Sequence, residues 1–456
     1  MCRPHPLLSF GIALSLAATA AASVHFDASP ITDAVQDGQG RIWGASEIGG
    51  WMVWENARWI PAEAVPTTPQ GSEAPVLGVS PAGSAHALWG GAPAEEGSDA
   101  EYLLARAGRD GQVETASFKA PPGLLFLTFG EAGEAWLTGR GPEVWRAGPD
   151  LSTPRRILRL STNQMAGWRF DIWNPLRVLS LPSRGAWLWG EQWRMELATL
   201  RGFVAVSESG AASVPPIEGL PGDGFSAVTP VSDETVWAGV ARWDAAAGLH
   251  EIDLATGRAR RVPEPEPGAF RHVRSIDRVG GDRYIIAGEL EHALRLWRWR
   301  GGRWTRLVEA LDEPSFQGSE RVERPWVTEP GGVWTGTGGR GLLWLPDSSP
   351  GPAEFLDWRR GQPLESVHRI FRGGDALVLI GFLHGTVEVG VEALRKGGAV
   401  SPRVVEVWKG AGNLQVDLRG WIWTLLGPDL AGWDGAGWVR HRLPEALVGH
   451  DVGGVL

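Results

Sequence analysis

The chain has 456 residues, of which 43% are hydrophobic, and a formal net charge of −10. That share of apolar residues is enough to build a core, so a disordered chain is excluded. The acidic balance and the lack of a basic stripe argue against nucleic acid as a partner. No segment reaches the 18 or so consecutive apolar residues that a membrane-spanning helix needs, so we expect no membrane insertion.

The first 22 residues are typical of a secretory signal peptide. Arg3 precedes an apolar run over residues 7–18, and the small residues from Thr19 to Ser23 suit a cleavage site. Such a segment is removed on export and is too short to anchor the protein in a membrane. We therefore predict a periplasmic or secreted protein spanning residues 23–456. Loss of Cys2 with the signal would leave no cysteine to form a disulfide.

The next feature in the chain is a unit that returns near its far end. DGQGRIWGASEIGGWMVWENARWIP (37–61) is matched by DLRGWIWTLLGPDLAGWDGAGWVRHRLP (417–444). Each predicts a short strand ending in Asp, a turn ending in Gly, a strand with a central Trp, and two further strands. Four short strands repeated along a chain are typical of a β-propeller.

Nine such units can be followed by the central residue of their second strand. These residues are Trp43, Trp89, Trp136, Trp187, Trp237, Ile285, Trp334, Leu379 and Trp423. They recur on average every 47 residues or so, within the roughly 40–50 residues of propeller repeats. The apolar runs are short and alternating, and 63 Gly and 33 Pro separate them. We predict an all-β single β-propeller of four-stranded antiparallel blades, with nine units counted and seven to nine blades in the ring.

The unit resembles the two-component-regulator propeller repeat, whose pattern is D-x-x-G-x-[IVL]-W-x-G-[TS]. The clearest matches are DGQGRIWGAS (37–46), EPGGVWTGTGGRGLLWL (329–345) and DLRGWIWTLL (417–426), and looser copies cover most of the chain after the signal. In that family the propeller is often the periplasmic ligand-binding part of a sensor. We expect this chain to carry the propeller without the membrane helix and the kinase that accompany it there.

Catalytic signatures are scarce in the sequence. G-x-S-x-G and H-E-x-x-H do not occur. Gly336, Gly338 and Gly341 spell G-x-G-x-x-G, but the strand-like LLWLP follows where a dinucleotide site needs a helix. We interpret this motif as a turn between two blade strands. The sequence predicts no cofactor and no metal, and an enzyme is the less favoured class.

Ligand binding in propellers tends to use the face where loops between second and third strands meet. This is an analogy at the level of the fold. The loops after the second strands carry charged and aromatic residues, which predict a ligand-binding set: Glu47, Arg140, Trp193, Arg194, Arg242, Trp243, Glu289, His292, Arg340 and His384.

Two functions remain open from the sequence. In the first, the protein is a sensor-like scaffold that binds a small polar ligand, a glycan or a protein partner on this face. In the second, it resembles streptogramin lyase and is a metal-assisted lyase or hydrolase, with Glu289, His292 and His384 supplying a base and ligands.

Overall fold

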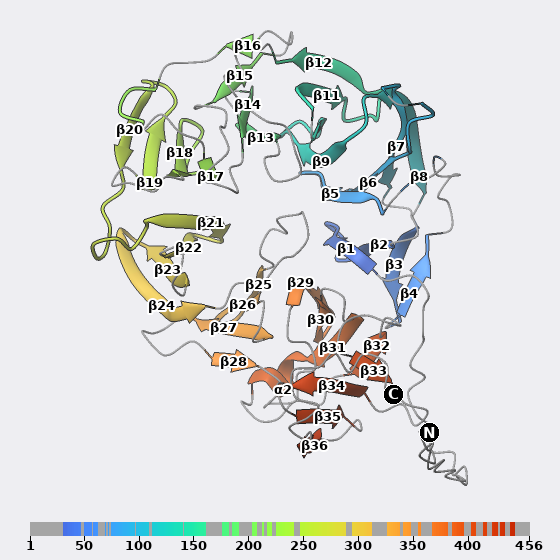
Figure 1. Ribbon diagram of the computed structural model, residues 1–456, viewed down its shortest axis with the longest axis vertical. Coiled ribbons are helices and arrows are strands. Elements are labelled where there is room, and N and C mark those ends of the chain that lie inside the picture. Colours follow the sequence, from blue (N-terminus) through green and yellow to red (C-terminus); the bar gives the residue numbers. More distant parts are fainter. Residues whose placement is uncertain are drawn as a thin grey trace, which may run out of the picture.

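The structure, a computed structural model, is a ring of small antiparallel sheets around a central axis (Figure 1). It describes residues between 31 and 442. The longer gaps are 63–68, 161–175, 191–202, 241–246, 312–325, 357–366, 396–402 and 407–413, and shorter gaps fall between strands. The described part contains nine four-stranded sheets, each made of four strands that are consecutive in the chain.

The first four sheets come from the amino-terminal half. Blade 1 consists of β1 (Ile31–Gln36), β2 (Ile42–Ser46), β3 (Trp51–Glu55) and β4 (Arg58–Pro61). Blade 2 consists of β5 (Val76–Val79), β6 (Ala85–Gly90), β7 (Ala100–Ala107) and β8 (Val113–Ala120). Blade 3 consists of β9 (Leu124–Phe129), β10 (Ala135–Gly139), β11 (Glu143–Ala147) and β12 (Arg155–Arg159). Blade 4 consists of β13 (Leu176–Leu181), β14 (Gly185–Gly190), β15 (Val204–Val206) and β16 (Ala212–Ser213).

The remaining sheets follow in the same order. Blade 5 consists of β17 (Phe225–Pro230), β18 (Thr235–Val240), β19 (Gly248–Asp253) and β20 (Arg258–Arg261). Blade 6 consists of β21 (His272–Val279), β22 (Asp282–Gly288), β23 (Leu294–Arg300) and β24 (Arg303–Leu311). Blade 7 consists of β25 (Trp326–Glu329), β26 (Gly332–Gly336), β27 (Leu342–Pro346) and β28 (Glu354–Leu356). Blade 8 consists of β29 (Val367–Gly373), β30 (Ala376–Gly381), β31 (Gly385–Gly390) and β32 (Arg403–Glu406). The ninth sheet, called unit 9, consists of β33 (Leu414–Val416), β34 (Ile422–Leu426), β35 (Asp429–Trp433) and β36 (Trp438–Arg442).

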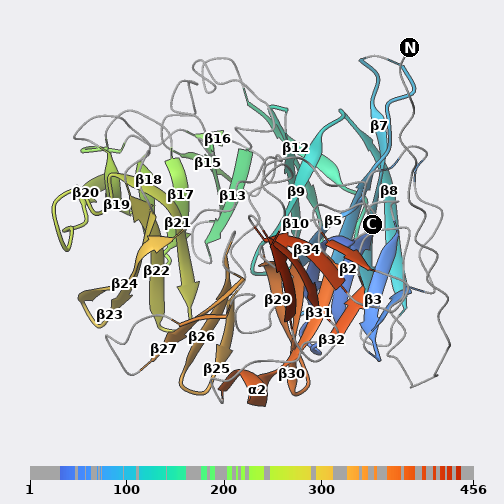
Figure 2. The same cartoon turned by 60° about the horizontal axis from the view of Figure 1, so that its bottom comes forward.

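Eight of these sheets form the ring. Their first strands, β1, β5, β9, β13, β17, β21, β25 and β29, surround the axis and are called the axial strands (Figure 1). In the turned view the blade strands run along the height of the ring (Figure 2). Unit 9 lies outside the ring, beyond blade 8 (Figure 1). The predicted all-β propeller is therefore confirmed, with eight blades in the ring and the ninth repeat as an additional sheet.

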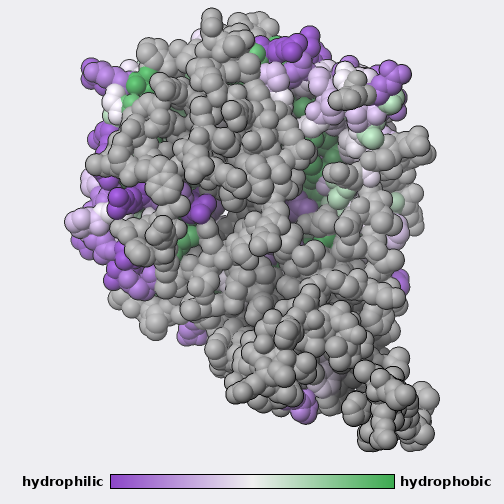
Figure 3. Space-filling view, viewed as in Figure 1, coloured by the Kyte–Doolittle hydropathy of each residue, from purple (hydrophilic) through white to green (hydrophobic). Residues whose placement is uncertain are grey.

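The core is divided among the junctions between blades. Among the described residues, eight apolar clusters lie one at each junction around the ring. The cluster between blades 8 and 1 joins Ile31 and Ile42 to Val378 and Ile380, so the ring is closed. Hydrophilic residues are prominent among the coloured residues at the outer edge of the molecule, as expected when apolar side chains fill the junctions (Figure 3).

All nine predicted anchor residues lie on second strands, which confirms the strand order within each unit. Seven of the eight blade anchors are less than 5% exposed, and the eighth, Trp187, is 5% exposed. Three of them nevertheless face the opposite way from the others. Trp89, Ile285 and Leu379 pack against the preceding blade, whereas Trp43 packs against the following one.

In those three blades the second-strand residues that face the following blade, as Trp43 does, are His86, Tyr284 and Val378. His86 lies against Phe129 of blade 3, and Tyr284 and Val378 belong to the clusters shared with blades 7 and 1. Because side chains alternate across a strand, an odd shift along it moves a residue to the other face of the sheet. The spacing between anchors therefore identifies the second strand of each unit, but it does not tell on which face of the sheet the anchor side chain lies.

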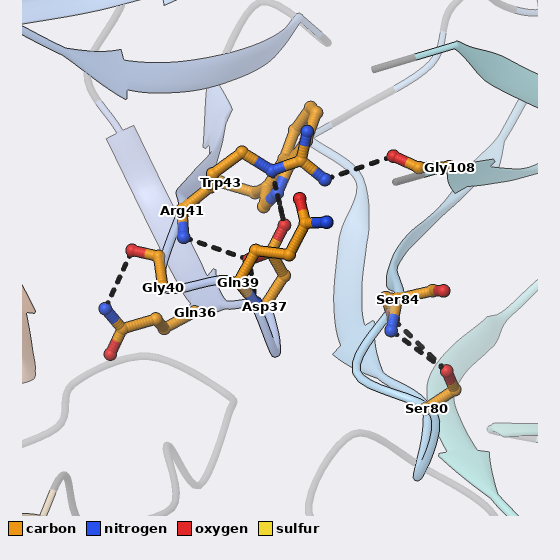
Figure 4. A network of polar contacts seen from close by, with 9 residues as sticks. All are labelled: Gln36, Asp37, Gln39, Gly40, Arg41, Trp43, Ser80, Ser84 and Gly108. Carbon is orange, nitrogen blue, oxygen red and sulfur yellow. Dashed lines mark hydrogen bonds and ion pairs between the residues drawn. The ribbon is translucent and has the colours of Figure 1, made fainter. Parts of the chain in front are cut away.

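The Asp and Gly of the repeat signature build the first turn of blade 1 (Figure 4). The side chain of Asp37 accepts hydrogen bonds from the backbone N–H groups of Gln39 and Arg41, both at 2.9 Å. It also accepts one from Trp43 Nε1 at 3.0 Å and one from Arg41 Nε at 2.7 Å. Gly40 closes the turn with a φ of 82°, a conformation that residues with a Cβ rarely adopt. The signature residues thus fix a turn and orient a core tryptophan.

The only helix within the described part is α2 (Val391–Arg395), and no helix there is long and apolar enough to cross a membrane. The predicted signal peptide lies outside the described residues.

Candidate functional site

All ten sequence-predicted ligand-binding residues lie outside the described residues, so their predicted roles stay predictions. All of them lie within five residues after the end of a second strand, and three follow the strand directly. Glu47 comes after the end of β2, Arg140 after the end of β10, and Glu289 after the end of β22. The end of the ring at which second strands finish can therefore be analysed through the described strands themselves.

The axial strands are irregular at this end of the ring. In five of the eight blades an extra residue interrupts the pairing of the axial strand with the second strand. The extra residues are Thr32, Leu125, Ser226, Arg274 and His368. A β-bulge of this kind bends a strand and re-aims side chains, and bulges are common beside functional sites. We call this end of the ring the bulge end.

An ion pair joins the axial strands of blades 8 and 1 at the bulge end. Arg369 Nε and Nη2 both lie 2.7 Å from Asp33 Oδ1. The two side chains are 17% and 28% exposed. Both side chains are therefore partly shielded from water. In such a place two charges interact more strongly than they do at the open surface.

Two further arginines occupy axial strands at the same end. Arg177, the second residue of β13, holds its guanidinium carbon 3.9 Å from the ring centroid of Phe126 on β9. Arg274 is the extra residue of the bulge in β21, and it is half-buried, as Arg177 is. A guanidinium and an aromatic ring at this distance attract each other, which helps to hold the Arg177 side chain in place.

Hydroxyl groups tie neighbouring blades together beneath these arginines. Ser226 Oγ donates to the carbonyl of Val273 in blade 6 at 2.6 Å, directly beside Arg274. Thr138 Oγ1 donates to the carbonyl of Leu176 in blade 4 at 2.7 Å, directly beside Arg177. The backbone that carries each arginine is therefore held by the preceding blade, which limits its movement.

The described part of the bulge end thus carries three axial arginines, Arg177, Arg274 and Arg369, and one axial acid, Asp33. The next acid along these strands is Asp277, which receives a hydrogen bond from Ser275 Oγ at 2.9 Å. This excess of positive charge contrasts with the net charge of −10 of the whole chain. Sequence reasoning missed these arginines because it searched the loops after the second strands, whereas they lie within the first strands of their blades.

Buried histidines form a second group that the sequence did not reveal. His272 opens β21 and is 6% exposed, and His368 is the extra residue of the bulge in β29 and is 3% exposed. Both belong to axial strands at the bulge end. Neither was in the predicted set, because a lone histidine within a strand pattern resembles any other interior residue.

A shallow recess lies at the opposite end of the ring, between the first turns of blades 1 and 2. It measures about 240 Å³ and is lined by Gly38, Arg41, Gly83 and Ser84, among others. A Cβ added to Gly83 would come within 2.8 Å of the Gly38 Cα, so the two turns touch backbone to backbone. Arg41 is held by Asp37 and by the carbonyl of Gly108, and its guanidinium lies over the Trp43 ring. This recess is a structural junction and offers few free polar groups.

The described residues contain no group of three or more His, Cys, Asp or Glu that could hold a metal ion. Glu289, His292 and His384, on which the metal-assisted alternative depends, are not among them. The arrangement that the structure does describe is suited to binding an anionic group.

No protein-family model matches the chain, and no curated protein matches it. The resemblance to the two-component-regulator propeller repeat is therefore not supported by a family match. Among solved structures, the Dos1 propeller is similar with a TM-score of 0.51 at 8% identity, over 77% of this chain and 89% of that one. This likeness supports the propeller fold and, at such low identity, nothing more.

Two other solved structures match more loosely. The extracellular domain of a protein described as a one-component system from B. thetaiotaomicron has a TM-score of 0.32 at 8% identity, over 92% of this chain and 72% of that one. The GH74 enzyme of Niastella koreensis has a TM-score of 0.40 at 10% identity, over 91% of this chain and 73% of that one. Likenesses at these TM-scores and identities assign no role to this chain.

Proposed function

We propose that this protein is an exported, sensor-like binding propeller that holds a small polar ligand at the bulge end of its axial strands. We further propose that the ligand bears a carboxylate or a similar anionic group. The observation that carries the proposal is the presence of Arg177, Arg274 and Arg369 on the axial strands of three different blades, all partly buried. Among the described residues of the axial strands at this end, Asp33, which pairs with Arg369, is the one acid.

The chemistry of these groups favours an anionic ligand. A guanidinium presents parallel N–H donors that match the two oxygens of a carboxylate. Strands of a rigid sheet hold such donors more precisely than flexible loops do. Arg177, Arg274 and Arg369 lie on the axial strands of blades 4, 6 and 8, so a ligand bound on the axis of the ring could be reached from three blades.

The aromatic ring beside Arg177 narrows the ligand class. Phe126 is half-buried on β9, and the Arg177 guanidinium lies over one face of its ring. A sugar acid combines a carboxylate that a guanidinium can bind with an apolar ring face that can pack beside an aromatic side chain. Acidic sugars, free or at the end of a glycan, are therefore the first candidates, and a protein partner would have to present Asp or Glu side chains instead.

Binding of a panel of small molecules to the purified protein tests this proposal. Titration calorimetry with glucuronate, galacturonate, simple dicarboxylates and the matching neutral sugars should give heat with the acids and none with the neutral sugars. Arg274→Gln should weaken binding by about tenfold or more, the usual effect of removing a charged hydrogen-bond donor.

Arg278→Gln is the matched control. Arg278 lies on the same strand, β21, but it is exposed and four residues nearer the opposite end. Its replacement should leave affinity unchanged. Equal binding of neutral and acidic sugars, or an equal loss in both variants, would exclude the axial arginines as the ligand site.

A further inference from the structure

Unit 9 repeats blade 1 closely enough to occupy the same place in the ring. We infer that blade 1 and unit 9 are alternative partners for blade 8, so that the ring can close with either of them. The argument rests on how the ring is closed, on the strand register of unit 9, and on the contacts that favour blade 1.

The junction between blades 8 and 1, called the seam, has no strand that both blades share. Each of the two blades is made of four consecutive strands, so neither lends a strand to the other. On the side of blade 1 the seam uses four buried apolar residues and two partly buried tryptophans: Ile31, Ala34, Ile42, Met52, Trp54 and Trp59. On the side of blade 8 it uses Phe371, Val378 and Ile380. A junction without a shared strand can be taken over by any sheet that presents the same residues.

The register of unit 9 is the register of blade 1. Ile42 pairs with Gln36, and Ile422 pairs with Val416. The cross-strand pair Trp54 and Trp59 has its counterpart in Trp433 and Trp438.

The match continues between the second and third strands. Gly44 pairs with Met52 in blade 1, and Thr424 pairs with Ala431 in unit 9. At the positions of unit 9 that match the seam positions of blade 1 from Ala34 onward, the sequence has Leu414, Ile422, Ala431, Trp433 and Trp438.

The other face of unit 9 also follows blade 1. Trp43, Ala45, Trp51 and Ile60 belong to the apolar cluster that blade 1 shares with blade 2. In register with them stand Trp423, Leu425, Leu430 and Val439. A sheet with apolar residues at both sets of positions is patterned to be covered on both faces, as a blade within a ring is.

Two polar contacts explain why blade 1 holds the seam in this structure. Asp33 pairs with Arg369, and Gln36 Nε2 donates to the carbonyl of Arg372 at 2.7 Å. The sequence of unit 9 offers Asn413 and Val416 at the two matching positions. Unit 9 can therefore supply the apolar part of the seam but not these two contacts, and blade 1 is the preferred partner.

A double-variant cycle in the full-length protein tests the exchange. Trp59→Ala should lower the melting temperature modestly because unit 9 then closes the ring, and Trp438→Ala alone should have little effect. The two together should lower the melting temperature by more than the sum of the single shifts. Additive shifts would overturn the inference.

Trp304 provides the matched control. It pairs with Trp299 in blade 6 as Trp59 pairs with Trp54 in blade 1, and it lies away from the seam. Trp304→Ala and Trp438→Ala should therefore be additive. The same synergy there would show a general loss of stability and would also overturn the inference.

Chemical cross-linking locates unit 9 directly. In a full-length Cys2→Ser background, Arg372→Cys and Val416→Cys should be joined within one chain by a short bismaleimide, because Val416 stands in register with Gln36, which contacts Arg372 across the seam. The yield should rise when Asp33→Ala and Gln36→Ala weaken the hold of blade 1. A yield that does not respond, or cross-links between chains only, would exclude exchange within the ring.

Discussion

The indole Nε1 of Trp59 donates a hydrogen bond to Thr386 Oγ1 at 3.0 Å, although 327 residues separate them. Thr386 is fully buried in blade 8, and Trp59 stands at the outer strand of blade 1 with its ring 5.1 Å from that of Trp54. This one contact joins the two ends of the described ring. It shows that closure depends on particular side chains, which makes the stability of the ring accessible to single substitutions.

Replacing either of two buried blade tryptophans should destabilise the protein. Trp237 and Trp334 are 3% and 4% exposed, and Trp237 Nε1 donates to Glu251 at 3.1 Å. We expect Trp237→Ala and Trp334→Ala each to lower the free energy of unfolding by roughly 3–5 kcal/mol, the usual cost of truncating a large core aromatic. Thermal and denaturant melts measure this. Lys119→Ala, at a 71% exposed side chain, is the control and should change little.

The signature aspartate should contribute through its turn. Burial alone would raise the pKa of Asp37, but hydrogen bonds from Trp43, Arg41 and Gln39 outweigh it and lower that pKa. Asp37→Ala leaves the Trp43 indole and two backbone donors without their acceptor, so we expect a loss of about 2–3 kcal/mol. Asp37→Asn should keep part of the stability. An unchanged denaturant midpoint in Asp37→Ala would contradict this role of the turn.

Acid should destabilise the ring through His86. Burial, with a smaller contribution from the positive charge of Arg106, lowers the pKa of His86 from 6.5 to about 4, although its hydrogen bond with the Ser84 carbonyl opposes the shift. Its ring lies 4.5 Å from that of Phe129 in blade 3. The unfolded chain therefore binds a proton at a higher pH than the folded chain does. Stability from this residue is complete above about pH 6.5 and declines as the pH falls toward 4, by about 3 kcal/mol.

Comparison with His86→Phe isolates that effect. Phenylalanine keeps an aromatic ring at the junction between blades 2 and 3 and cannot take up a proton. Melts from pH 7.5 to pH 4 should show a shallower loss of stability in the variant. Parallel pH profiles for the two proteins would show that His86 is accessible to protons in the folded state.

Export should remove the start of the chain. The charged residue Arg3, the apolar run over 7–18 and the small residues before Ser23 predict cleavage after Ala22. Amino-terminal sequencing of material recovered outside the cytoplasm should therefore begin near Ser23. Recovery of a chain that still begins at Met1 would rule out this signal.

The repeating unit was predictable because its residues act locally. Asp37, Gly40 and Trp43 interact within one turn and one strand, so their spacing carries the whole signal. It was less predictable on which face of its sheet each anchor side chain lies. Blade 6 makes its first turn with Gly280 and Gly281 alone, whereas blade 1 needs a longer turn, and this changes which residue of the second strand meets the next blade.

The number of blades in the ring could not be predicted from spacing. Unit 9 carries the same Asp and Trp pattern as blade 1, yet Ile31 and Ile42 of blade 1 occupy the seam. Which of two similar sheets closes a ring is decided by contacts between distant segments, such as the pair formed by Asp33 and Arg369.

The candidate site illustrates the same limit. Bulge residues such as Arg274 owe their position to an interruption of strand pairing. No pattern in the sequence predicts where such an interruption occurs. The loop residues that the sequence favoured, Trp193 and Trp243 among them, lie outside the described residues, so their part in binding stays a prediction.

The construction of every blade from consecutive strands also bears on how fast the protein reaches its native state. Almost all pairings join neighbours in sequence, so each blade can form soon after its own residues are available and can then add to the previous one. The seam is different, because its loop must span most of the chain and closing it has the largest entropic cost. We therefore expect the contact between blades 8 and 1 to form last during refolding and to be the first lost when the protein begins to unfold.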